Sequence, residues 1–198
     1  MPKFQILVAR LKPRRALLLG LLLAGAAAGD EVVKIYQDPA FDATVSKILV
    51  VGVHEDLGVR GQFENTVARA VRSVGASGEA SFYSVGGIAE LTAEALVAAA
   101  RRARADAVLV TRVVDVQTQD VDAANFPDYF RAYSRYGDPL PASETHTVRV
   151  RTDLYLVESQ ARVWGVESTA FEKPSLFGVI DGIAKAVAAQ LRSDGLVR

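Results

Sequence analysis

The chain has 198 residues, half of them apolar, with 23 basic and 23 acidic residues, two histidines and no cysteine. This composition is that of one globular domain, and it excludes disulfides, thiolate metal sites, a cysteine nucleophile and a three-histidine zinc site. The first 29 residues carry five basic residues and no acid, so the remainder has 18 basic and 23 acidic residues, a net charge of −5. We therefore predict no metal, no cofactor and no nucleic-acid partner.

The N-terminal region has the layout of a secretory signal. Residues 1–15 are basic, and residues 16–29 form an unbroken run of apolar and small residues. That run is too short to span a bilayer, which takes about 20 helical residues. We predict a signal peptide over residues 1–28, cleaved after Ala28, and export to the periplasm. Without cleavage, the same segment would hold the protein at the membrane.

One part of this signal resembles a bacterial lipobox. Residues 23–26 read Leu-Ala-Gly-Ala, and Ala26 stands where a lipobox has its lipid-bearing cysteine. An acyl chain on that cysteine would tether the protein to a membrane. Because the cysteine is missing, the sequence does not support a lipid anchor.

The mature chain begins with an N-terminal extension over residues 29–45 that can add an edge strand, followed by one domain over residues 46–198. The domain opens with alternating strands and helices, and this order indicates parallel strands joined by right-handed crossovers. Hydrophobic periodicity predicts strands at 46–53, 81–85 and 107–114 and helices at 61–74 and 92–104.

The second half of the domain has a different pattern. Residues 147–157 alternate between apolar and polar, which predicts a strand with one exposed face. A turn and a second strand at 162–169 complete an antiparallel hairpin, and a helix over 175–193 closes the chain. The predicted fold class is therefore α/β: a single domain with a mixed sheet in two or three layers.

Several short segments resemble a known group of envelope proteins. They are the strand Ile-Leu-Val-Val at 48–51, the helix start Arg-x-x-Phe-Glu at 60–64, the hairpin with Val-Trp at 163–164, and the helix end at 191–196. Over residues 46–197 the chain resembles small exported lipoproteins of unknown function with the TolB amino-terminal or CsgG-like α/β fold. The resemblance implies that fold and a place in the cell envelope.

Polar residues follow the first buried strand, where α/β folds commonly bind ligands. His54 and Asp56 lie in the loop, Arg60 lies on the next helix, and Asp115 follows a later strand. These four residues are the candidate ligand-binding site. The alternative is an ordinary polar loop that caps a helix. The sequence contains no nucleophile motif, so we assign no catalytic residue.

Aromatic residues cluster in an insertion at about 120–145. Their spacing of three and four places them on one helical face, which could bind a partner or pack on its own domain. The candidate interaction residues are Phe126, Tyr129, Phe130, Tyr133 and Tyr136.

Two functions follow from these observations. The first is a non-catalytic periplasmic binding or assembly module that docks an envelope protein or a second copy of itself through the aromatic insertion. The second is a small-ligand-binding or enzymatic domain with its site at the loop after the first buried strand. The clustered aromatic residues favour the first function.

Overall fold

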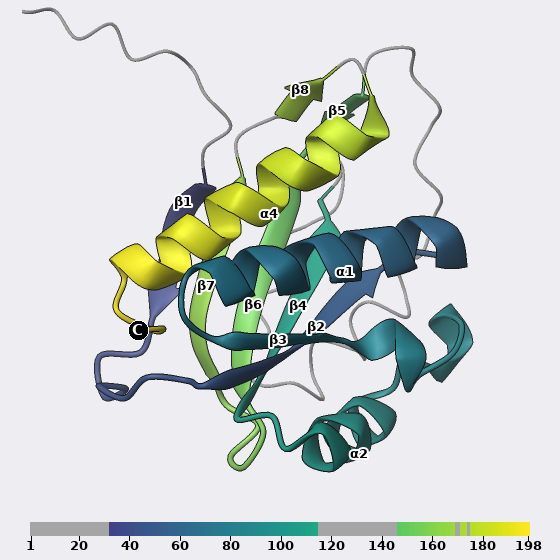
Figure 1. Cartoon of the computed structure of the whole chain (residues 1–198). Coiled ribbons are helices and arrows are strands. Elements are labelled where there is room, and N and C mark those ends of the chain that lie inside the picture. Colours follow the sequence, from purple (N-terminus) through teal and green to yellow (C-terminus); the bar gives the residue numbers. More distant parts are fainter. Residues whose placement is uncertain (1–31, 115–145, 169–170, 174) are drawn as a thin grey trace, which may run out of the picture.

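The computed structural model describes residues 32–114, 146–168, 171–173 and 175–198. Figure 1 shows a twisted sheet with helices packed against it. The strands are β1 (Val32–Gln37), β2 (Lys47–Val53), β3 (Ser77–Ala80), β4 (Ala107–Val113), β5 (His146–Val148), β6 (Val150–Leu156), β7 (Arg162–Ser168) and β8 (Phe171–Lys173). The helices are α1 (Leu57–Ser73), α2 (Ala93–Ala103) and α4 (Leu176–Ser193), with short 3-10 turns η1 (Ser81–Tyr83) and η2 (Ile88–Glu90).

The main sheet has six strands in the order β1-β7-β6-β4-β2-β3. Strand β2 runs parallel to both β3 and β4, whereas β6 is antiparallel to β4 and β7, and β1 is antiparallel to β7. Strands β5 and β8 form a separate antiparallel pair. This topology confirms the predicted α/β domain, including the central parallel pair, the antiparallel hairpin and the closing helix.

Helices cover both faces of the sheet, so the domain has three layers. Figure 1 shows α1 and α4 side by side in front of the strands. On β2, Ile48 and Val50 belong to the core under these two helices, while Leu49 and Val51 belong to the core under α2. A strand buried on both faces needs apolar side chains at every position, which explains its unbroken apolar run.

The strand predicted at 81–85 is misplaced. The structure has β3 at Ser77–Ala80, and the predicted span at 81–85 begins with the turn η1. Helix α1 presses directly on β3: a Cβ atom at Gly78 would lie 2.5 Å from the carbonyl oxygen of Ala68. Only glycine fits at this point of contact. A short strand that contains glycine lacks the run of apolar side chains from which strands are predicted.

The prediction that one face of the strand over residues 147–157 is exposed is also wrong. Arg151, Asp153 and Tyr155 alternate with apolar residues on β6, yet each is at most 3% exposed. Arg151 Nε lies 3.1 Å from Asp153 Oδ2, and Arg162 Nη1 lies 3.6 Å from Asp153 Oδ1. Opposite charges satisfy one another here, so charged side chains that alternate along a strand need not face water.

A polar contact ties the edge of the sheet to the end of α4. Trp164 on β7 is fully buried and its Nε1 donates to Asp194 Oδ2 at 2.7 Å, while Lys34 Nζ on β1 lies 3.0 Å from Asp194 Oδ1. Partial burial alone would raise the pKa of Asp194, but the hydrogen bonds from Trp164 and Lys34 lower it overall. The carboxylate therefore stays ionised and holds three elements together.

Candidate functional site

The loop after β2 holds two of the predicted ligand-binding residues. Asp56 is the N-cap of α1, and its Oδ1 accepts hydrogen bonds from the backbone N–H groups of Gly58 at 2.7 Å and Val59 at 2.9 Å. These bonds to Val59 and Gly58 lower the pKa of Asp56. The backbone N–H of Asp56 in turn donates to His54 Nδ1 at 3.0 Å. The side chains of His54 and Asp56 thus both bind backbone N–H groups at the start of α1.

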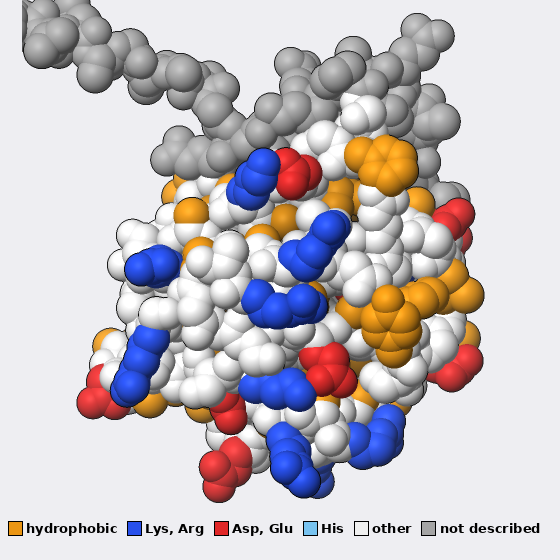
Figure 2. Space-filling view, viewed as in Figure 1, with side chains coloured by type: hydrophobic (Ala, Val, Ile, Leu, Met, Phe, Trp, Pro, Cys, Tyr) orange, Lys and Arg blue, Asp and Glu red, His pale blue; other side chains and the backbone are white. Residues whose placement is uncertain are grey.

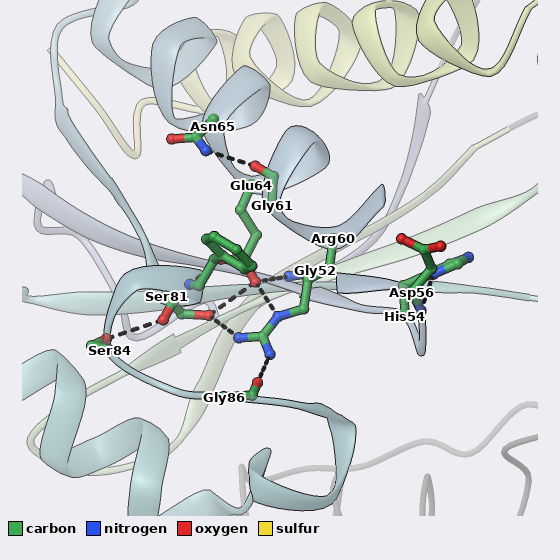
Figure 3. A network of polar contacts seen from close by, with 11 residues as sticks. Gly52, His54, Asp56, Arg60, Gly61, Glu64, Asn65, Ser81, Ser84 and Gly86 are labelled. Carbon is green, nitrogen blue, oxygen red and sulfur yellow. Dashed lines mark hydrogen bonds and ion pairs between the residues drawn. The ribbon is translucent and has the colours of Figure 1, made fainter. Parts of the chain in front are cut away.

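Arg60 and Glu64 form a fully buried ion pair one turn further along α1 (Figure 3). Arg60 Nε lies 2.8 Å from Glu64 Oε1, Arg60 Nη2 donates to Ser81 Oγ at 2.9 Å, and Arg60 Nη1 donates to the carbonyl oxygen of Gly86. Three of its donors are therefore engaged, and Figure 3 shows the guanidinium group of Arg60 among Glu64, Ser81 and Gly86.

The Glu64 carboxylate joins three elements of the fold. Besides Arg60, it accepts from the backbone N–H of Gly52 at 3.0 Å, from Ser81 Oγ at 2.9 Å and from the backbone N–H of Phe82 at 2.5 Å. Strand β2, helix α1 and turn η1 are thus fixed to one charged group. A buried carboxylate that accepts from this many donors stabilises the packing of these elements against one another.

The structure places His54, Asp56 and Arg60 close together in sequence and space after β2, and the side chain of each already bonds to other groups of the protein. Asp115 lies outside the described residues. No group of three metal-ligating side chains occurs within residues 32–114, 146–168, 171–173 and 175–198. Ligand binding by these residues stays a prediction.

A cavity of about 70 Å³ lies beside this loop, between α1, α4 and the sheet. Figure 1 shows the two helices diverging toward their N-terminal ends. Apolar side chains from both helices make most of its wall, and its polar members are His54, Arg60, Thr111 and Arg112. The lining consists of Gly52, Val53, His54, Val59, Arg60, Phe63, Thr111, Arg112, Val113, Val150, Leu176, Val179, Ile180 and Ile183.

Sequence reasoning missed the charge cluster centred on Asp153, which lies on the sheet face opposite α1 and α4. Burial raises the pKa of Asp153, and the charges of Arg151, Arg162 and Arg112 offset part of that rise. The Arg162 guanidinium carbon also lies 4.3 Å from the ring centroid of Tyr36. The sequence did contain a signal for this cluster: arginine and aspartate alternate on one predicted strand, and the neighbouring strands each carry an arginine.

The predicted interaction residues between positions 126 and 136 lie outside the described residues, as does the predicted signal peptide over residues 1–28. The structure does show where the segment 115–145 is attached. Val113 pairs with Val150 across β4 and β6, and the backbone N–H of Val114 donates to the carbonyl oxygen of Arg149 at 2.8 Å. Within the described part of the chain, no helix is long and apolar enough to cross a membrane.

Comparisons with known proteins give similarity in structure only. No protein-family model matches the chain, and no curated protein matches its sequence. A point variant of the PelC dodecamer from Paraburkholderia phytofirmans is 18% identical, with a TM-score of 0.47, 80% of this chain covered and 96% of that one. A second structure of the PelC dodecamer from the same organism is also 18% identical, with a TM-score of 0.45, 85% of this chain covered and 99% of that one.

The lipoprotein GNA1162 from Neisseria meningitidis is 17% identical, with a TM-score of 0.39, 75% of this chain covered and 99% of that one. At this level of similarity the comparisons assign no function to this chain. The resemblance to TolB amino-terminal and CsgG-like domains stays a prediction.

Proposed function

We propose that this chain is an exported, non-catalytic docking module of the bacterial cell envelope. It binds a protein partner or a second copy of itself through the aromatic segment, whose residues are Phe126, Tyr129, Phe130, Tyr133 and Tyr136. Export rests on the predicted signal over residues 1–28. Aromatic side chains supply large contact areas with few rotatable bonds, which suits a docking surface.

The observation that carries this proposal is how the segment 115–145 joins the sheet. Strands β4 and β6 are antiparallel neighbours, paired from Ala107 with Leu156 to Val113 with Val150. A few residues would suffice to join two such strands. The connection between β4 and β6 is therefore much longer than their pairing requires. Long insertions at the end of a rigid sheet are common places for binding residues.

The polar residues at the same end of the sheet support a binding function over catalysis. Asp56 caps α1, and Arg60 and Glu64 neutralise each other inside the fold. Groups held in this way stabilise the scaffold that carries the insertion. The docking surface would then be the insertion itself.

We expect the double variant Tyr129→Ala/Tyr133→Ala to lose association while keeping its melting temperature. Central aromatic residues of an interface contribute about 2 kcal/mol or more each to binding. Tyr83→Ala is the matched control, because Tyr83 is 74% exposed on η1. Pull-down from envelope extracts and size-exclusion chromatography measure association, and circular dichroism measures melting. If the segment packs on its own domain, truncation instead costs about 3–5 kcal/mol of stability, the melting temperature falls, and the docking assignment is wrong.

The cavity beside His54 favours a second candidate function, the binding of a small molecule. It lies at the carboxyl end of the parallel strands β2 and β4, the place predicted for a ligand. Its mostly apolar wall fits an apolar group. A small molecule retained by protein purified from the envelope would support this function.

A further inference from the structure

We propose that the cavity between α1 and α4 binds a short branched aliphatic group that carries a carbonyl or carboxylate oxygen. The inference names the ligand class for the small-molecule function, the second candidate above, and rests on it. It is independent of docking through the aromatic segment.

The floor of the cavity is apolar. Phe63 on α1 and Val179, Ile180 and Ile183 on α4 line it, and each is at most 9% exposed. The one hydroxyl in this wall, Thr111 Oγ1, bonds to Thr152 Oγ1 at 2.9 Å, so it already has a partner. An apolar cavity without free polar partners holds water poorly and accepts an apolar group.

The size of the cavity limits the ligand. Its volume of about 70 Å³ is roughly half that of an engineered apolar cavity of about 150 Å³ that binds benzene. It is also far below the range of about 300–1,000 Å³ for sites that take drug-sized ligands. A short branched chain therefore fits, and a long acyl chain does not.

His54 can supply one hydrogen-bond donor to a ligand in the cavity. It is half-buried, it lines the cavity, and its Nδ1 accepts from the backbone N–H of Asp56 at 3.0 Å. Because Nδ1 accepts, the neutral ring carries its proton on Nε2. Nε2–H would then donate to an oxygen at the head of the ligand, with the apolar end held by the floor.

The test uses two probes on the purified domain with methyl-labelled valine and isoleucine. Isovalerate has the branched chain and the carboxylate, whereas xenon has only the apolar character. We expect both probes to shift the methyl signals of Val179, Ile180 and Ile183 saturably, isovalerate in the millimolar range. Octanoate should produce no saturable shift, because its chain exceeds the cavity.

Three variants separate the parts of the proposal. Val59→Phe fills the cavity from α1 and should abolish both titrations. Leu57→Phe adds the same ring two residues earlier, at a position that is 45% exposed and does not line the cavity, and should leave both intact. His54→Phe removes the donor and should weaken isovalerate about tenfold with xenon unchanged.

The outcomes show whether the proposed ligand class alone is wrong or the binding site itself is wrong. If xenon enters the cavity but isovalerate does not, or if His54→Phe leaves isovalerate binding unchanged, the proposed ligand class is wrong and small-molecule binding stands. If neither probe shifts these methyl signals, or if Val59→Phe changes nothing, both the ligand class and the site are wrong.

Discussion

Replacing Glu64 by alanine is expected to lower the free energy of unfolding by about 3–5 kcal/mol. The substitution leaves the guanidinium of Arg60 buried without its counter-charge, and Arg60 is 0% exposed. It also removes the acceptor for the backbone N–H groups of Gly52 and Phe82. A buried donor without an acceptor adds its own desolvation cost.

The measurement is urea unfolding followed by circular dichroism. Glu158→Ala is the matched control, because Glu158 is exposed and its loss should change stability by less than about 0.5 kcal/mol. Arg60→Ala should be similarly severe, and the double variant should cost much less than the sum of the two single variants because the pair acts as a unit. Additive costs would show that the two residues do not depend on each other, contrary to the structure.

The second large effect is expected from Val50→Asp on β2, which should abolish cooperative folding. Val50 is fully buried between the parallel neighbours β3 and β4. An unpaired buried charge costs several kcal/mol, comparable with the total stability of about 5–15 kcal/mol of a typical domain. Leu109→Asp on β4 should have the same result.

Val33→Asp is the matched control for this experiment. It makes the same substitution on a strand, but Val33 on β1 is 54% exposed. Thermal melting of the control should stay close to that of the native protein. A native melting transition in Val50→Asp would mean that β2 is not at the centre of the core.

The central strands could be predicted from the sequence because their burial is visible in it. Strands covered on both faces are apolar at consecutive positions, as β2 and β4 are. Helix caps are equally local: Thr92 is the N-cap of α2, and Ser175 is the N-cap of α4, where its side chain accepts from the backbone N–H of Gly178 at 3.1 Å. Such signals depend only on neighbouring residues.

The turn after β3 could not be predicted because its partner is distant in the sequence. The predicted strand began at Ser81, and the residues there suit a strand. In the structure, the Glu64 carboxylate accepts from Ser81 and Phe82, seventeen and eighteen residues later, and holds them in η1. Tertiary contacts of this kind override local preference.

Of the four predicted ligand-binding residues, the structure describes three, and their binding of a ligand stays a prediction. A fold rule predicts His54, Asp56 and Arg60 near the carboxyl end of the first buried strand, and in the structure they lie in the loop after β2 and at the start of α1. No sequence pattern shows that Arg60 turns toward Ser81 and Gly86, or that α1 and α4 leave a cavity between them. Both features depend on contacts between segments that are distant in the sequence.

The most direct measurement of the docking function is site-specific photo-crosslinking in growing cells. A benzophenone amino acid replaces Tyr133 in the aromatic segment in one strain and the exposed Tyr83 on η1 in another. The docking account predicts a crosslinked product of defined mass from position 133 and none from position 83. No product from position 133, or the same products from both positions, would contradict it.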